Sequence, residues 1–171
     1  PNGHVINYRY DAAERLIGWT DNRGQRGDYT LDPMGNATHE VVRNSGGQVA
    51  FELRRVINSL NRVESETIGT SQVEHYSYDA NGKRVSTRDA ANNATTQQLD
   101  ALNRVTAITN PMGRTARLTY NPLDAVTQAS DFKSVTTTYV RDVQGNARSE
   151  ATPDAGTTQT SYDVRGLPAQ V

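Results

Sequence analysis

The apolar residues of this chain alternate with polar ones over short segments, and no segment keeps a period of 3.6 residues. Tyr8 and Tyr10 stand two residues apart, which places both side chains on one face of a β-strand. Segments such as 135–139 and 157–162 are rich in Thr and Tyr, which favour strands. The pattern therefore predicts an all-β protein with essentially no helix.

A short phrase of turn-forming residues interrupts these segments eight times. It reads aromatic or aliphatic residue, Asp or Asn, two variable residues, then usually Gly, Asn or Asp. The copies begin at Tyr10, Leu31, Ile57, Tyr78, Leu99, Tyr120, Arg141 and Tyr162. They are 21 residues apart, except for 26 between the second and the third. A fixed period indicates tandem copies of one supersecondary unit, so we predict a single repeat array over residues 1–171.

The chemistry of the phrase predicts a β-hairpin tip in each copy. With its first residue numbered zero, position one is Asp or Asn, whose short side chain accepts a backbone hydrogen bond and opens a tight turn. Position four favours residues that tolerate positive φ, as a three-residue hairpin loop requires. The predicted structural turn residues are Asp11, Asp32, Asn58, Asp79, Asp100, Asn121, Asp142 and Asp163 at position one, with Gly35, Gly82, Gly145 and Gly166 at position four.

A second turn signal lies halfway through many units, for example in segments 20–24, 110–113 and 152–156. Each unit then has two strands and two turns, which predicts an antiparallel sheet built from tandem hairpins. The five additional residues of the long gap are expected in a longer, protruding turn near 44–48. A sheet with this many strands twists and curls, so we expect a curved wall.

Composition limits the function classes. The chain has 18 basic and 19 acidic residues and no basic block, so binding to nucleic acid is not expected. No run approaches the roughly 18 apolar residues of a membrane-spanning helix, so membrane insertion is not expected. Cysteine is absent, which excludes disulfides and thiolate metal sites. Leu, Ile, Val and Phe make up only 31 of the 171 residues, which indicates a polar sheet with little buried surface.

The sequence contains no convincing catalytic or metal-binding pattern. His4, His39 and His75 have no metal-ligand spacing, and one Asp at each tip falls short of the roughly six to eight oxygens that calcium takes. We therefore expect no enzyme activity, no cofactor and no metal. Trp19 and the tyrosines could line a sugar-binding face, although cross-strand aromatic pairs explain them more simply.

Basic residues follow the turn at position five in several copies: Arg15, Arg62, Lys83 and Arg104. We interpret them as neighbours that balance the turn carboxylates rather than as ligand-binding groups.

The phrases Tyr10-Asp11, Tyr78–Gly82 and Tyr162–Gly166, with the Pro-x-Gly half-repeat turns, resemble the YD repeats of the RHS family. That family includes bacterial RHS polymorphic toxins, the shell subunits of Tc toxins and the teneurins. The resemblance implies a long antiparallel sheet that coils into a hollow shell, which in the toxins encloses a C-terminal toxic domain before delivery. It implies that this chain is an arc of such a shell and a fragment of a larger protein.

The same resemblance implies partners and a location. The partners would be the rest of the parent RHS shell, its toxin cargo and a secretion-system component. The protein would be secreted or on the cell surface, as a bacterial effector delivered out of the cell in competition between bacteria. A cell-surface adhesion or carbohydrate-binding module stays open as the alternative.

Some copies depart from the family pattern. Arg141 replaces the aromatic residue, Glu14 the glycine and Pro168 the aliphatic residue, which suggests a degenerate array with less buried surface. Asp32–Gly35 matches the DPxG phrase that accompanies self-cleavage in the family, but its register makes Asp32 position one of a repeat. We therefore interpret this segment as a turn.

Overall fold

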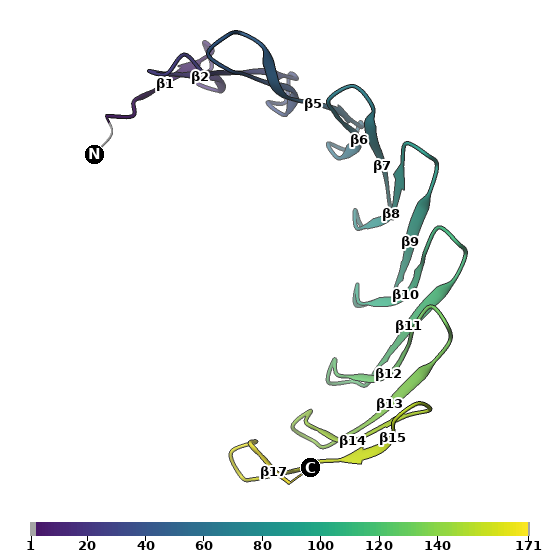
Figure 1. Ribbon diagram of the computed structural model, residues 1–171. Coiled ribbons are helices and arrows are strands. Elements are labelled where there is room, and N and C mark those ends of the chain that lie inside the picture. The colour runs from purple at the N-terminus through teal and green to yellow at the C-terminus, as the bar shows by residue number, and fades with distance from the viewer. Residues whose placement is uncertain (1–2, 171) are drawn as a thin grey trace. The chain divides into compact units, whose positions relative to one another are not determined.

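The computed structural model describes residues 3–170, and every helix or strand assigned in that part of the chain is a β-strand (Figure 1). The contacts divide the chain into two units, which are described separately. The first unit comprises residues 1–77 and 87–93, and the second comprises residues 78–86 and 94–171. The chain passes from one unit to the other between Ser77 and Tyr78, within strand β8 (Arg84–Asp89), and between Asn93 and Ala94.

The strands before β8 are β1 (Ile6–Tyr10), β2 (Leu16–Asp21), β3 (Arg26–Leu31), β4 (Ala37–Arg43), β5 (Val49–Ile57), β6 (Val63–Ile68) and β7 (Gln72–Tyr78). Those after it are β9 (Ala94–Leu99), β10 (Val105–Thr109), β11 (Thr115–Tyr120), β12 (Val126–Ser130), β13 (Thr136–Arg141), β14 (Ala147–Thr152), β15 (Gly156–Gln159), β16 (Ser161–Tyr162) and β17 (Pro168–Gln170).

Strand order in the main sheet follows the chain from β1 to β15, and β16 and β17 form a separate two-stranded sheet. From β1 to β7 and from β9 to β15, each strand pairs antiparallel with the next. The prediction of an all-β antiparallel fold made of tandem hairpins is confirmed. Because strand direction alternates, the turns of the repeated phrase lie at one end of the strands and the half-repeat turns lie at the other end (Figure 1).

A β-bulge follows the repeated phrase, as the predicted loop type requires. Arg9 pairs with Gly18 whereas Tyr10 pairs with Leu16, so Ile17 is left over. The same shift recurs in later copies.

In three copies the left-over residue is a threonine. Its hydroxyl donates to the carbonyl eight residues earlier, in the pairs Thr38–Thr30 (3.2 Å), Thr106–Gln98 (3.3 Å) and Thr127–Thr119 (3.2 Å). These hydroxyls tie the bulge to the partner strand.

Segment 44–48 does not form the longer, protruding turn that the sequence predicted. Its backbone closes like the other turns, because the Asn44 N–H donates to the Gln48 carbonyl (3.0 Å) and the Gly47 N–H to the Asn44 carbonyl (2.9 Å). The additional residues of this repeat lie instead in β4, with 7 residues, and β5, with 9. The prediction of a longer turn is therefore wrong, because the additional residues lengthen the two strands of the hairpin and not its turn.

Little of the sheet is buried. Val41, Leu53 and Ala107 are the buried apolar residues among those described, and they are 8, 8 and 3% exposed. Stability must therefore come largely from strand pairing, turn chemistry and cross-strand side-chain contacts.

One such contact joins aromatic and glycine residues on the first three strands. Trp19 pairs with Tyr8 on one side and with Gly27 on the other. A Cβ atom at Gly27 would lie 2.2 Å from the Trp19 Nε1 atom, so the indole occupies the space over this glycine. The expected cross-strand aromatic pairing is confirmed for Tyr8 and Trp19.

The left-handed conformation predicted for the turn glycines is confirmed at Gly82, Gly145 and Gly166, whose φ angles are 84°, 90° and 77°. Replacing Gly82 by Val should lower the free energy of unfolding by about 1–2 kcal/mol, because a β-branched residue is strained at positive φ. Gly82→Asn is the matched control, since Asn61 adopts a φ of 61° at the equivalent position. Urea denaturation measures both, and a neutral Val variant would mean that the turn has another geometry.

Candidate functional site: the capped turns and the edge they form

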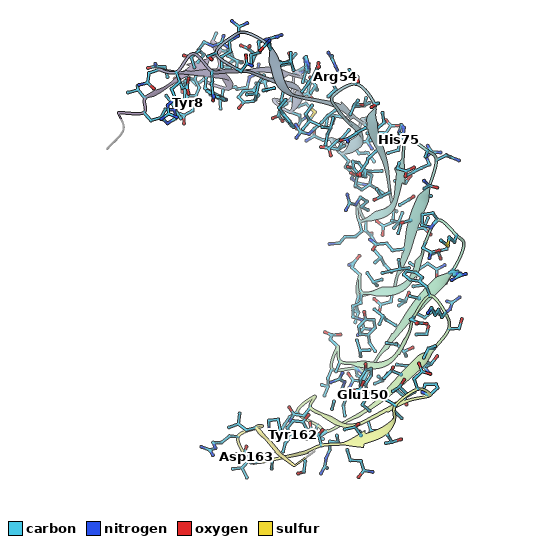
Figure 2. The ribbon with its side chains drawn as sticks, viewed as in Figure 1. Tyr8, Arg54, His75, Glu150, Tyr162 and Asp163 are labelled. Carbon is cyan, nitrogen blue, oxygen red and sulfur yellow. The ribbon has the colours of Figure 1, made fainter. Side chains whose placement is uncertain are left out.

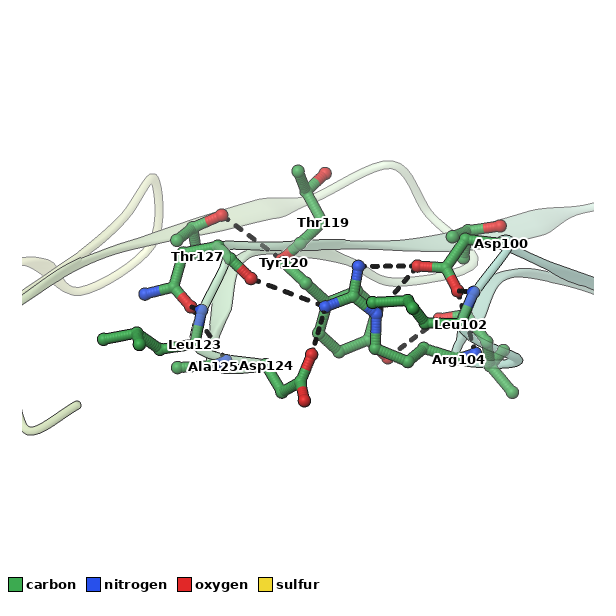
Figure 3. Close-up of polar contacts among 12 residues, drawn as sticks. Asp100, Leu102, Arg104, Thr119, Tyr120, Leu123, Asp124, Ala125 and Thr127 are labelled. Atoms are coloured by element: carbon green, nitrogen blue, oxygen red, sulfur yellow. Dashed lines mark hydrogen bonds and ion pairs between the residues drawn. The ribbon is translucent and has the colours of Figure 1, made fainter.

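Each repeated phrase is closed by the same five-residue pattern, seen clearly at residues 100–104 (Figure 3). The Asp100 N–H donates to the Arg104 carbonyl (3.0 Å), and the Asn103 N–H donates to the Asp100 carbonyl (2.9 Å). The Asp100 Oδ1 atom accepts the N–H groups of Leu102 (2.9 Å) and Arg104 (3.0 Å). One side-chain oxygen thus satisfies two backbone donors that the tight turn leaves without strand partners.

The other copies repeat this arrangement. The same two donors reach the Oδ1 atom of Asp11, Asp32, Asn58, Asn121, Asp142 and Asp163. Asp79 has the two backbone bonds and accepts the Lys83 N–H (2.9 Å). Gly35 has a φ of 92°, and Glu14, which departs from the glycine pattern, still adopts 60°. The structure therefore places every predicted turn residue in one common turn geometry.

Sequence reasoning missed that most half-repeat turns use the same cap. Asp21, Asn44, Asp89, Asn110 and Asp131 each accept two backbone N–H groups in the same register. Their left-handed residues are Gly24, Gly47, Asn92, Gly113 and Ser134. The sequence does contain a signal for these caps, which is Asp or Asn followed three residues later by Gly, Asn or Ser. Unlike the repeated phrase, however, these turns have no aromatic residue before the Asp or Asn.

In several turns, the second carboxylate oxygen of the capping aspartate also accepts a hydrogen bond. The Asp11 Oδ2 atom accepts from the Arg15 guanidinium (2.7 Å), and the Asp100 Oδ2 atom from that of Arg104 (2.6 Å). Asn36 takes this place in the second copy and donates to Asp32 Oδ2 (2.8 Å). For Arg15 and Arg104, the interpretation that position five balances the turn carboxylate is confirmed.

Position five also links successive turns along one end of the strands. Arg104 reaches the next turn, where it pairs with the Asp124 carboxylate (2.6 Å), and its guanidinium lies 4.6 Å from the centroid of the Tyr120 ring (Figure 3). In the first unit, Arg15 donates to the Asp32 carbonyl (3.4 Å). These contacts hold neighbouring turns at a fixed spacing.

Position zero makes a second link, which runs back to the preceding repeat. The Tyr120 hydroxyl donates to the Val105 carbonyl (2.8 Å), and the Tyr162 hydroxyl donates to the Ala147 carbonyl (2.9 Å). Tyr162 and Asp163 begin the eighth copy and are labelled in Figure 2. Each acceptor lies 15 residues before its donor, at position six of the preceding repeat.

Arg141 keeps this link although it is not aromatic. Its Nε atom donates to the Val126 carbonyl (2.6 Å), again 15 residues earlier. Its guanidinium also donates to the Gly145 carbonyl (2.9 Å) and lies 5.3 Å from the centroid of the Tyr139 ring. The substitution therefore preserves the hydrogen bond between repeats while changing the side chain that makes it.

This equivalence makes a prediction for Arg141. The Arg141→Tyr variant should unfold within about 0.5 kcal/mol of the native chain, because a tyrosine hydroxyl makes the same bond in other copies. The Arg141→Leu variant should be less stable by about 0.5–1.5 kcal/mol, since it removes the donor. Guanidinium denaturation compares the two, and equal stability of both variants would show that the link contributes nothing.

The caps lower the pKa of several turn carboxyl groups. At Asp100, the N–H of Arg104 and then its guanidinium stabilise the carboxylate and lower its pKa. At Asp32, the side-chain amide of Asn36 is the main cause of the lowered pKa. At Asp163, the pKa is lowered mainly by the N–H of Leu167. The caps thus favour the charged form of each group in the folded state.

Acid should therefore destabilise the fold. A carboxyl group whose pKa is lower in the folded state stabilises it above the unfolded value, near 4, and that contribution is lost as the pH falls through the folded value. We expect the melting temperature to be nearly constant from about pH 7 to 5 and to fall below about pH 4. Thermal melts at a series of pH values measure this fall.

The Asp163→Asn variant supplies the control for the acid melts, because an amide oxygen can still accept the two N–H groups but does not titrate. Its melting temperature should fall less steeply below pH 4 than that of the native chain. A steeper fall would contradict the assignment of acid sensitivity to the caps.

Among residues 3–170, no three His, Asp or Glu side chains are grouped so that they could hold a metal ion. Within the same described range, no helix has the length and apolar character needed to cross a membrane. Asp32 has one oxygen bound to two backbone N–H groups and the other to the Asn36 amide. This geometry is that of a turn cap, in agreement with its register.

Comparison with known proteins agrees with the repeat pattern. Residues 100–136 match the family model described as RHS repeat, which confirms the resemblance drawn from the repeated phrase. The fold is similar to the crystal structure of TcdB2-TccC3-Cdc42, with 16% identity and a TM-score of 0.71 over 95% of this chain. It is also similar to the Photorhabdus luminescens Tc holotoxin pore with a mutated TccC3, with 13% identity and a TM-score of 0.68 over 95% of this chain.

These structures share the fold, but they are much longer. The chain spans 10% of the first of them and 12% of the second. No curated protein matches it in sequence.

Proposed function

We propose that this chain is a non-enzymatic part of the wall of an RHS-type shell that encloses a toxic effector domain for delivery. The observation that carries this proposal is the uniform edge. The turns of the repeated phrase share one capped geometry, and Arg15 and Arg104 tie the first and the fifth of these turns to the turns that follow them. Such a strip is held at its edge rather than by a deep core, which suits a wall with two accessible faces.

The repeat match and the shared fold support the same proposal. In a shell, the partners are further RHS repeats of the parent protein and its toxin cargo, with a secretion-system component during delivery. Residues 1–171 then belong to one repeat array. The protein acts outside the cell that makes it, and nucleic acid, cofactors and metals have no part in its role.

The turn chemistry also bears on catalysis. The turn carboxylates accept backbone N–H groups, and Asp11 and Asp100 add a cation on the second oxygen. An acid or base needs an oxygen that can reach a substrate, so these groups are poor candidates for general acid–base chemistry.

Limited proteolysis of the parent protein tests the shell role. The gene on both sides of these 171 codons should encode further repeats and a C-terminal domain of different composition. That domain should resist protease in the intact protein and become sensitive when the repeats are destabilised by Gly18→Ala. A C-terminal domain that is digested equally in both proteins would refute enclosure.

The alternative, an adhesion or carbohydrate-binding module, has one specific observation in its favour. A hollow lined by aromatic side chains lies on the first three strands.

A further inference from the structure

The β6–β7 hollow, of about 440 Å³, lies beside these two strands, and all of its lining residues belong to the first unit. Carboxylates and apolar side chains both line it, and they include Glu66, Ile68, Val73, Glu74, Tyr76 and Asp89. His75, which lies between Glu74 and Tyr76 in the chain, is labelled in Figure 2 and marks the position of β7.

The strand register places two like charges at this hollow. Glu66 on β6 is the direct cross-strand partner of Glu74 on β7. Like charges directly opposite each other in an antiparallel pair destabilise it. Arg55 bonds to the Oε1 atom of Glu66 (2.8 Å), but it also pairs with Glu40, so its charge does not offset that of Glu74. The hollow therefore holds a carboxylate pair that works against the pairing of its own strands.

The Tyr76 hydroxyl stands between these two carboxylates. It lies 2.9 Å from the Oε2 atom of Glu66 and 2.9 Å from the Oε2 atom of Glu74. A tyrosine hydroxyl has one hydrogen, so it donates to one of these acceptors at a time. Burial, followed by the bonds to Glu74 and Glu66, raises the pKa of Tyr76 and keeps its hydroxyl protonated. Within residues 3–170, the Oε1 atom of Glu74 accepts no hydrogen bond, so it is open to a further donor.

The remaining wall of the hollow is apolar. The Ile68 side chain is 45% exposed, and Val73, Ala90 and Ala91 line the same hollow. A ligand that fits this wall and the carboxylate pair needs a cationic donor next to a hydrocarbon chain.

We propose that the β6–β7 hollow binds a primary ammonium group carried on an unbranched hydrocarbon chain. The ammonium would donate to Glu74 and lie near Glu66, which replaces the repulsion of the pair by attraction to a shared cation, and the chain would cover Ile68. Small-ligand pockets of about 300–1,000 Å³ combine apolar walls with a few polar groups, as this hollow does. A free diamine and a lysine side chain both carry this chemistry.

The geometry favours an ammonium group over other cations. Both oxygens of Asp89 are occupied, by backbone N–H groups and by the Asn93 amide (2.9 Å), and no cluster of three His, Asp or Glu side chains within residues 3–170 could hold a metal ion. A guanidinium group binds best to both oxygens of one carboxylate, but Arg55 already holds one oxygen of Glu66. An ammonium group has three donors on a compact charge, which can turn towards oxygens of different residues.

Nuclear magnetic resonance of the isotope-labelled 171-residue chain tests the proposal. The chain is titrated with cadaverine, a free diamine, and with Nα-acetyl-lysine methylamide, both in the millimolar range. At least one of them should shift the backbone amide signals of Ile68 and Glu74 saturably, and the tighter of the two identifies the source of the ammonium group. Nα-acetyl-norleucine methylamide keeps the hydrocarbon chain without the charge, so it should leave these signals unchanged.

Glu74→Gln should weaken this binding by about tenfold, because it removes a charge-assisted hydrogen bond. Without ligand, the same variant should melt at the same or a higher temperature than the native chain, because the repulsion from Glu66 is gone. Glu64→Gln is the matched control, since Glu64 is an exposed carboxylate on β6 that does not line the hollow. Its affinity for the ligand should stay close to that of the native chain.

Ile68→Ala supplies a second variant that changes no charge. It should weaken the binding several-fold, because part of the apolar wall is lost. The proposal would be overturned by an absent response to both ammonium compounds or by equal binding of the norleucine or the corresponding arginine derivative. Equal losses for Glu64→Gln and Glu74→Gln, or a lower melting temperature of Glu74→Gln without ligand, would overturn it as well.

Discussion

The Gly18→Ala variant should be less stable than the native chain by about 1–3 kcal/mol, as expected for overpacking. A Cβ atom at Gly18 would lie 2.5 Å from the Gly27 carbonyl oxygen and 2.3 Å from a guanidinium nitrogen of Arg9. The arginine side chain can move, but the carbonyl belongs to the paired strand β3. The added methyl group must therefore distort the pairing between β2 and β3.

The reason for a glycine here is a contact across three strands. Arg9 pairs with Gly18, Gly18 pairs with Asp28, and the Arg9 guanidinium passes over the glycine to bond with the Asp28 carboxylate. Gly46→Ala is the control, because its Cβ would meet side-chain atoms no closer than 3.3 Å. Urea denaturation should show little change for Gly46→Ala, and equal losses for the two variants would contradict the steric explanation.

The Asn121→Ala variant should be less stable by about 1–2 kcal/mol, a loss comparable to that of a helix N-cap. The Asn121 Oδ1 atom accepts the N–H groups of Leu123 (2.9 Å) and Ala125 (3.0 Å), and alanine offers no replacement. This cap is uncharged, so the loss isolates the hydrogen bonds from the ion pairs found at the aspartate turns.

Asn121→Asp is the matched control for this cap. It keeps an Oδ1 acceptor, so its stability near pH 7 should be close to that of the native chain. Below about pH 4 the Asn121→Asp variant should lose more stability than the native chain, because its additional carboxyl group is then protonated. Chemical denaturation at the two pH values measures both effects, and an Asn121→Ala variant as stable as the native chain would show that the cap is dispensable.

Much of the fold could be predicted from the sequence because turn chemistry is local. Position one and position four lie within four residues of each other, so Asp163 and Gly166 identify a hairpin tip without knowledge of the rest of the chain. The same local rule was present at Asp21 and Gly24, where the sequence predicted a turn over residues 20–24 but not that it uses the same cap, because no aromatic residue marks its start.

What could not be predicted depends on register. The bond from Arg141 to the Val126 carbonyl joins residues 15 positions apart, and only the strand pairing brings them together. The hollow at Trp19 likewise depends on the pairing of that residue with Gly27. The location of the five additional residues was predicted wrongly because the composition of segment 44–48 suits a flexible loop and an ordinary capped turn equally well.

Cryo-electron microscopy of the parent protein tests the central claim most directly. The account predicts that residues 3–170 form part of a wall of tandem hairpins around an enclosed volume that contains density for another domain. A repeat strip with solvent on both faces and no enclosed density would contradict it.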